Sequence, residues 1–314
     1  MQIIYLDQNK WIELARAAKH PEEYPELFGL LSKLGNAVEA GRALVPLTAT
    51  NIYETHKIAQ PRRRNELAAI QSFLSRGCVF RGRHKRLEVE FGLAFLPVYG
   101  NPPPTLGPYW FLSDIFFEAF AEYGDERTPT VCSERFVTSV RREPAFWLYH
   151  YLTEVPEQTR VAAVAAFSKG SEQLRKRIEE RRAQHASESI SMRRRIQSAL
   201  LAIAEIDLIL KFAADAGLPW KSVTDIGRSN LLRLVNEVPT YHIEREVVLR
   251  LESQTRPIEE NDFRDMQTFC AVLRYADDVV AENMFSNLAR QARLDKKYDT
   301  RVCTNLLSLT ATLH

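Results

Sequence analysis

The sequence predicts an α/β protein whose mostly parallel sheet is split along the chain by a large helical insertion. Near both ends of the chain, short β-rich runs alternate with amphipathic helices, which is the order typical of parallel sheets. Between these regions the apolar residues recur with the 3.6-residue period of helices. The 314 residues, 45% of them hydrophobic, suffice for a discontinuous domain and an insertion. We predict an α/β domain over residues 1–91 and 256–314 and a helical insertion over residues 92–255.

The N-terminal part of this domain contains three β-rich runs separated by helical segments. The first run ends at Asp7, and Gly41 ends the second helix. The residues from Thr48 to Asn51 give the start signal of a further helix. The predicted strands cover residues 2–6, 43–47 and 77–80, and the predicted helices start near residue 11, cover 24–40, start at 48–51 and cover 62–74.

The alternation stops after about residue 91 and returns near the C-terminus. A proline-rich loop over residues 101–105 leads into a region whose pattern is helical almost throughout, from Trp110 to about Leu251. The predicted C-terminal elements are a helix over 260–275, a strand over 278–281, a helix over 284–294 and an edge strand over 300–303.

Five acidic residues lie where ligands bind in open parallel sheets. Asp7 and Glu282 end predicted strands, and Glu54 lies one turn into the helix after the second strand. Asp262 and Asp265 begin a later helix, three residues apart and so on one face. The carboxyl ends of parallel strands meet at one crevice, where crowded carboxylates repel one another. A hard divalent cation such as Mg²⁺ or Mn²⁺ would relieve this repulsion, so we predict a metal site there.

Each of these acids also has an ordinary structural explanation. Asp7 could cap the following helix, and Glu54 could be a surface acid of its helix. Asp262 could interact only with the helix dipole. Asp277 and Asp278 fit turn residues better than metal ligands.

The acidic segments resemble the successive motifs of a PIN-like nuclease domain. The segments are IIYLDQNKWIELA, VPLTATNIYETHKI and NDFRDMQTFCAVLRYADDVVAENMF. The resemblance implies a three-layer α/β/α fold and Mg²⁺- or Mn²⁺-dependent cleavage of RNA, less often DNA. The family more often has Asp at the position of Glu282, and the helical insertion has no counterpart in it. Carried over residue by residue, it implies metal-binding catalytic residues at Asp7, Glu54, Asp265 and Glu282, an auxiliary ligand at Asp262, and polar support for metal-bound waters from Asn9, Thr50 and Asn51.

Basic clusters suggest a nucleic acid partner, although the net charge is only +2. Residues 259–282 hold seven acids and two arginines, whereas residues 157–200 hold ten basic and five acidic side chains. Phosphate backbones are bound largely through such basic residues. Solvated helix faces are the alternative explanation. The predicted nucleic-acid contacts are Arg81, Arg83, Lys85, Arg86, Arg193, Arg194 and Arg195.

Other functional classes fit the sequence less well. The four scattered cysteines exclude a disulfide framework and a zinc finger. We expect a cytoplasmic protein with no membrane partner, because the most apolar long stretch, residues 198–217, contains four charged residues. A nucleotide phosphohydrolase would need a glycine-rich phosphate loop, which is absent. We therefore predict a metal-dependent endoribonuclease that uses a metal-activated water.

Two questions stay open at this stage. The family's habits suggest a bacterial toxin or antiphage context for such an enzyme. The alternative is a non-catalytic nucleic-acid-binding or interaction module that retains the fold. The helical insertion could also bind a second copy of the chain or a partner protein.

Overall fold

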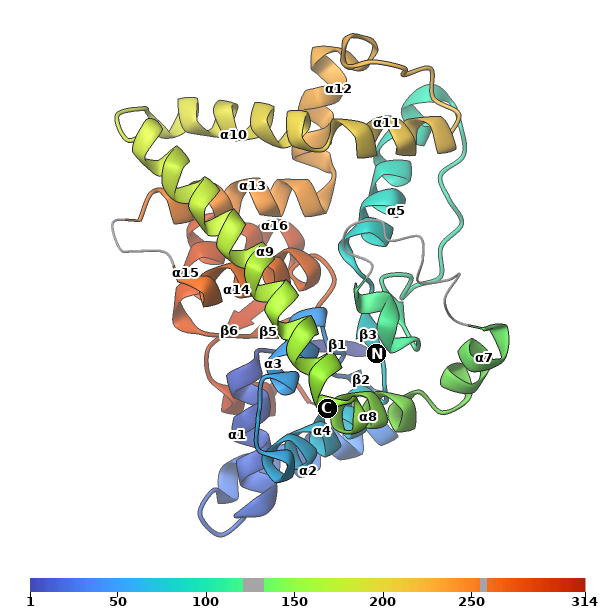
Figure 1. Cartoon of the computed structure of the whole chain (residues 1–314), viewed down its shortest axis with the longest axis vertical. Helices are drawn as coiled ribbons and strands as arrows, with labels where there is room; N and C mark the ends of the chain where they lie inside the picture. The colour runs from blue at the N-terminus through green and yellow to red at the C-terminus, as the bar shows by residue number, and fades with distance from the viewer. Residues whose placement is uncertain (121–132, 255–258, 314) are drawn as a thin grey trace.

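The computed structural model describes residues 1–120, 133–254 and 259–313, without the side chains of residues 167, 171 and 260–265. The chain is mostly helical and contains a four-stranded sheet in the order β2-β1-β5-β6 (Figure 1). All three strand pairings are parallel. These findings are compatible with the predicted α/β class. The strands are β1 (Gln2–Leu6), β2 (Ala43–Leu44), β5 (Asp278–Val280) and β6 (Arg301–Cys303).

The two ends of the chain build this sheet together, as predicted. In the centre, Leu6 of β1 is paired with Val280 of β5. On the far side of β5, Val279 is paired with Val302 of the edge strand β6. The strands are short apolar runs because parallel strands are covered on both faces.

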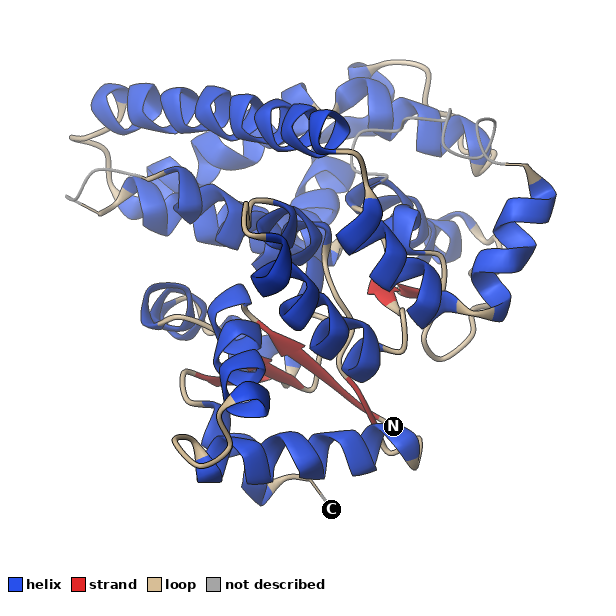
Figure 2. Cartoon of the chain, turned by 60° about the horizontal axis from the view of Figure 1, so that its bottom comes forward, coloured by secondary structure: helices blue, strands red, loops and turns tan. Residues whose placement is uncertain are grey.

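Successive side chains of the strands point to opposite faces of the sheet. Helices cover both of these faces (Figure 2). Ile4 and Leu6 join one apolar cluster, whereas Ile3 and Tyr5 join the other. The first cluster includes residues of α1 (Gln8–Lys19), α2 (Pro25–Glu39), α3 (Ala49–His56), α4 (Pro61–Ser75) and α8 (Pro144–Glu154). The second includes residues of α9 (Glu157–Gln184), α13 (Pro239–Glu252), α14 (Glu260–Val272), α15 (Asn283–Gln291) and α16 (Leu294–Tyr298).

The central part of the chain packs partly on the sheet domain and partly on itself. Helices α9 and α13 contact α14, and α8 contacts α4. A third apolar cluster lies between α5, α11, α12 and the start of α13. The predicted domain boundary at residue 91 falls inside α5. The remaining helices are α5 (Arg83–Phe95), α7 (Glu134–Arg142), α10 (Ile190–Ala204), α11 (Ile206–Asp215), α12 (Val223–Glu237) and the short 3-10 helices η1 (Leu96–Tyr99), η2 (Phe116–Phe120) and η3 (Leu306–Ala311).

Two sequence-based assignments are wrong in detail. The predicted strand over 43–47 is shortened to Ala43–Leu44, because Pro46 has no N–H for the ladder; Leu47 forms only an isolated bridge to Val79. The predicted strand over 77–80 lies outside the main sheet. There, β3 (Val79–Phe80) pairs antiparallel with β4 (Leu112–Ser113), inside the region predicted to be helical.

No helix in the described ranges is both long and apolar enough to cross a membrane.

Candidate functional site

Asp7 and Glu282 occupy equivalent positions at the same end of the sheet. Leu6 and Val280 are the last paired residues of the neighbouring strands β1 and β5. Asp7 directly follows β1 and Glu282 follows β5 by two residues, and each is the N-cap of the next helix. Both have the same backbone angles, φ −65° and ψ 158°. Two strand–turn–helix units therefore place one carboxylate each at the carboxyl ends of adjacent parallel strands.

The two carboxylates differ in what they bind. Asp7 accepts a hydrogen bond at 2.7 Å from the backbone N–H of Gln8, so it does cap α1. Glu282 accepts no capping hydrogen bond from its own helix. Instead it accepts a hydrogen bond from the side-chain amide of Asn9, in the first turn of α1. Asn9 thus joins the two strand–turn–helix units at the predicted site.

The electrostatic surroundings of Asp7 are unfavourable for its charge. Burial, and after it the negative charges of Glu282 and Glu54, raise its pKa to about 6. The Gln8 N–H and the Lys10 ammonium oppose this rise and do not outweigh it. Since Glu282 and Glu54 both act on Asp7, the fold brings these three predicted site residues close enough to interact.

Glu54 is placed by a well-capped helix. Thr48 and Asn51 form a reciprocal capping box at the start of α3, with the Thr48 N–H donating at 3.0 Å to the Asn51 side chain. Glu54 lies one turn further on, half-buried, with its carboxylate 3.6 Å from the Lys57 ammonium. Asn51 is fully buried and Thr50 is 8% exposed. The predicted role of these two residues in supporting metal-bound waters stays a prediction.

A buried polar network, which we did not predict, lies next to Asp7. The Gln8 amide donates to the Thr55 hydroxyl at 3.1 Å, and Thr55 is 2.9 Å from the Gln71 side chain. The Asn51 side-chain amide donates to the side-chain oxygen of Gln8 at 3.4 Å. These contacts tie α1 to α3 and α4 directly behind the predicted site. The only signal in the sequence is the i, i+4 pair of Asn51 and Thr55 on a helix that is otherwise largely apolar on that face.

Asp7 and Glu282 line one shallow hollow, too small to enclose a water molecule, together with a residue of α14. This residue is Thr268, which is 3% exposed and whose hydroxyl has no hydrogen-bond partner in the described part of the chain. Asp265 precedes it by three residues, but the side chains of Asp262 and Asp265 lie outside the described residues. Among the described side chains, no three His, Cys, Asp or Glu groups converge as a metal site. The hollow is lined by Tyr5, Asp7, Thr268, Phe269, Ala281, Glu282 and Phe285.

The first predicted basic cluster is largely occupied by contacts within the protein. Arg83 donates to Glu244 at 2.6 and 2.9 Å and to Glu205 at 3.0 Å. Arg86 is buried and donates to the backbone oxygen of Arg81. In turn, Arg81 donates to the Trp110 backbone oxygen at 2.9 Å and to Glu118. The exposed Lys85 forms an ion pair with Glu88 at 2.9 Å.

In the second predicted basic cluster, two of the three arginines also bind groups of the protein itself. Arg194 donates to both carboxylate oxygens of Glu246, at 3.0 and 3.1 Å. Arg193 donates to backbone oxygens in the turn before α10, at 2.8 and 3.0 Å. Arg195 is exposed. Nucleic-acid binding by these two clusters stays a prediction.

No protein-family model, curated protein or solved structure matches the chain. The geometry at the carboxyl ends of β1 and β5 is therefore the basis for any assignment of function.

Proposed function

We propose that the protein is a divalent-metal-dependent nuclease of the PIN-like type, acting as an endoribonuclease on single phosphodiester bonds. The observation that carries the proposal is the equivalent placement of Asp7 and Glu282 at adjacent strand ends, facing one hollow. This is the position at which parallel α/β sheets bind their ligands. The sheet with helices on both faces is compatible with the three-layer fold that the sequence resemblance implies.

The donor atoms are of the kind that a hard cation binds. Asp7 and Glu282 supply carboxylate oxygens, and Thr268 lines the same hollow. Glu54 acts electrostatically on Asp7, although the described acids do not converge as a three-acid metal site. Mg²⁺ and Mn²⁺ prefer such oxygen ligands and retain waters in their coordination shell. Asp265 would add a further carboxylate one turn before Thr268 on α14. A cation would also stabilise the Asp7 carboxylate, whose pKa is raised by burial and, after it, by the charges of Glu282 and Glu54.

The described residues divide into those that hold the cation and those that position them. A bound divalent cation supplies an activated water and neutralises charge on the phosphodiester. Asn9 orients the Glu282 carboxylate by a hydrogen bond, and the Gln8 N–H fixes the Asp7 carboxylate. The Gln8–Thr55–Gln71 network holds the start of α1 against α3 and α4. No protein nucleophile is needed for this reaction.

A cleavage assay tests the proposal. The full chain is incubated with end-labelled single-stranded RNA and DNA, with Mn²⁺ or with EDTA. We expect cleavage only with the metal, and Asp7→Asn to lower its rate by about a hundredfold or more, because a ligand to the catalytic ion is lost. Glu26→Gln is the matched control, since Glu26 is an exposed acid in the first turn of α2. Cleavage that persists in EDTA or in Asp7→Asn contradicts the proposal.

One observation favours a second candidate function. Asp7 already has a structural role as the cap of α1, which a non-catalytic binding module would also need. That candidate predicts binding of the labelled RNA or DNA that weakens with salt, and no cleavage under any metal condition.

A further inference from the structure

A second hollow, of about 430 Å³, lies between α1 and α4. Its volume is in the range of sites that hold small molecules or parts of larger ligands. Its floor is apolar and includes Ile12, Ile58 and Leu67. Its rim carries the cations Arg16, Lys19 and Arg63 together with the acids Glu23 and Glu66. Glu23 lies 3.7 Å from His20, and Glu66 pairs with Lys19. We call it the α1–α4 hollow.

The rim of the α1–α4 hollow carries cations that the protein itself does not neutralise. Arg16 and Arg63 are exposed, and no carboxylate in the described part of the chain pairs with either. By contrast, Lys19 shares the carboxylate of Glu66 with Arg62, at 2.7 and 3.1 Å. An anionic ligand would therefore find two free guanidinium groups above an apolar floor.

The run of three arginines at the start of α4 shows how this rim is built. Arg62 pairs with Glu66 on the surface. Arg64 is buried and donates at 2.8 Å to the backbone oxygen of Ile58, which fixes the turn that closes the hollow. Arg63, between them, lines the hollow. One residue of the run is thus left for a ligand, while its two neighbours have partners in the protein.

The α1–α4 hollow is connected to the candidate site by the surface of α1. Asn9, Ile12 and Arg16 recur at intervals of three and four residues, which places them on one face of the helix. This face starts at the Asn9 that donates to Glu282 and ends in the hollow. Arg16 lies nine residues after Asp7, about 14 Å along the helix axis. A few nucleotides of an extended strand would cover that distance.

We propose that the α1–α4 hollow binds the single-stranded flank of a nucleic acid whose scissile phosphodiester lies at Asp7 and Glu282. Phosphates contact Arg16 and Arg63, and an unpaired base stacks on Tyr24, which is 38% exposed at the edge of the hollow. A duplex would offer only its backbone, because its bases are already stacked on each other. The proposed position of the scissile bond rests on the proposed function, whereas binding of the strand in the hollow does not.

Binding measured in EDTA tests this inference without cleavage. The probes are short fluorescent single-stranded RNA and DNA, the matching duplex and a poly-glutamate peptide, all followed by anisotropy with the full chain. Arg16→Gln with Arg63→Gln should weaken single-strand binding about tenfold and lower the slope of log affinity against log salt by about 1.4, since two phosphate contacts are lost. Lys33→Gln with Arg228→Gln, two exposed cations outside the hollow, is the matched control and should leave both values unchanged.

Tyr24 tests the stacking contact separately. Tyr24→Ala should weaken single-strand binding about tenfold, whereas Tyr24→Phe should retain it, because stacking needs only the ring. Since Tyr24→Phe changes one exposed hydroxyl, it also controls for a folding defect at the start of α2.

The outcomes separate this inference from the proposed function. The inference is overturned if the double variant Arg16→Gln with Arg63→Gln binds single strands as tightly as the wild type does. It is also overturned if the wild type binds the duplex or the peptide more tightly than it binds the single strand. Either result counts even where Asp7→Asn is inactive. If the double variant loses single-strand binding in EDTA while neither it nor the wild type cleaves RNA or DNA, the inference stands and the proposed function fails.

Discussion

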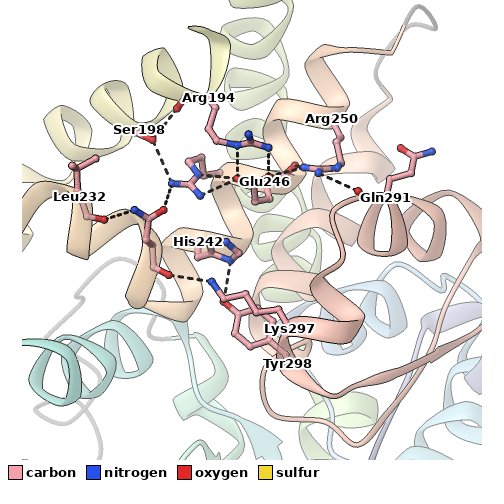
Figure 3. A network of polar contacts seen from close by, with 11 residues as sticks. Arg194, Ser198, Leu232, His242, Glu246, Arg250, Gln291, Lys297 and Tyr298 are labelled. Atoms are coloured by element: carbon pink, nitrogen blue, oxygen red, sulfur yellow. Dashed lines mark hydrogen bonds and ion pairs between the residues drawn. The ribbon is translucent and has the colours of Figure 1, made fainter. Parts of the chain in front are cut away.

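Buried carboxylates in two regions of the molecule are treated in opposite ways. In the helical region, Glu246 of α13 is 5% exposed and contacts Arg194, Arg245 and Arg250 (Figure 3). Burial opposes its charge, yet these hydrogen bonds and charges outweigh burial and lower its pKa to about 2. At the sheet end, burial and neighbouring acids raise the pKa of Asp7 to about 6. Glu246 is compensated by the protein, and Asp7 is not.

This difference separates structural from functional charge. The network around Glu246 also reaches the C-terminal elements, where Arg250 donates to the Gln291 backbone oxygen at 3.3 Å and Lys297 to the Asn236 backbone oxygen at 3.1 Å (Figure 3). It thus joins α12 and α13 to α15 and α16, which is a structural task. Asp7 caps α1, but burial and neighbouring acids disfavour its ionised form and raise its pKa, and perturbed groups of this kind cluster at functional sites.

The largest expected effect is on stability, at Glu246. Glu246→Gln removes a carboxylate shared by three arginines and should lower the free energy of unfolding by roughly 3–5 kcal/mol, the usual cost of leaving a buried pair without one partner. Urea unfolding at neutral pH measures it. Glu237→Gln is the control, because Glu237 is half exposed in a single ion pair with Arg233 and should change stability by less than about 1 kcal/mol. Equal effects of the two substitutions would remove the distinction between compensated and uncompensated acids.

The next effect concerns the sheet end. Because burial and the nearby charges of Glu282 and Glu54 disfavour the ionised form of Asp7, a bound cation should be stabilising, and Mn²⁺ at a hundred times its Kd should stabilise the protein by about 2.7 kcal/mol. A thermal unfolding series with increasing Mn²⁺ measures this shift. Asp7→Asn should abolish the shift, whereas Glu246→Gln should keep it. A shift of the same size in Asp7→Asn would place the bound ion elsewhere.

The features that repeat locally could be predicted from the sequence. The apolar runs before Asp7 and Glu282 identified both strands, and acids directly after strands identified one end of a parallel sheet. The partners of the basic clusters could not be predicted in this way. Arg83 pairs with Glu244, 161 residues away, and Arg194 with Glu246, 52 residues away. A run of arginines looks the same in sequence whether its partner is a phosphate or a distant carboxylate.

The residue that α14 contributes to the site shows a second limit of prediction from the sequence. Thr268 lines the hollow with Asp7, but one threonine on a helix of mixed polarity gives no signal of its own. It could have been suspected only from its position three residues after Asp265. The short β3–β4 pair was missed for a similar reason, since each strand has two residues and no periodicity can be read from two residues.

Removal of the Asp7 charge should stabilise the metal-free protein, which is the opposite of the effect at Glu246. The folded-state pKa of Asp7 is about 6, above its ordinary value of 3.8. The stability that Asp7 contributes through its raised pKa is therefore fully present below pH 3.8 and is lost as the pH rises through 6. In EDTA at neutral pH, Asp7→Asn should be more stable than the wild type by roughly 2 kcal/mol, since asparagine still caps α1.

Urea unfolding from pH 4 to pH 8 measures this difference, which should vanish near pH 4. Glu26→Gln, the exposed acid of α2, should follow the wild type at every pH. A destabilised Asp7→Asn at neutral pH would show that the carboxylate is needed for the fold, as that of Glu246 is.

The smallest expected effect on stability is at Asn9, the one side chain that the protein supplies as a donor to Glu282 among the described contacts. Because this hydrogen bond is exposed, Asn9→Ala should cost only about 0.5–1 kcal/mol of unfolding free energy. It should nevertheless weaken Mn²⁺ binding about tenfold, since a donor that orients a metal ligand acts on affinity more than on stability. Calorimetric Mn²⁺ titration measures the affinity, with the exposed Asn101→Ala as control. A change in stability without a change in Mn²⁺ affinity would make Asn9 a structural partner of Glu282. Glu282 would then be a carboxylate that the protein itself compensates, like Glu246 and unlike Asp7.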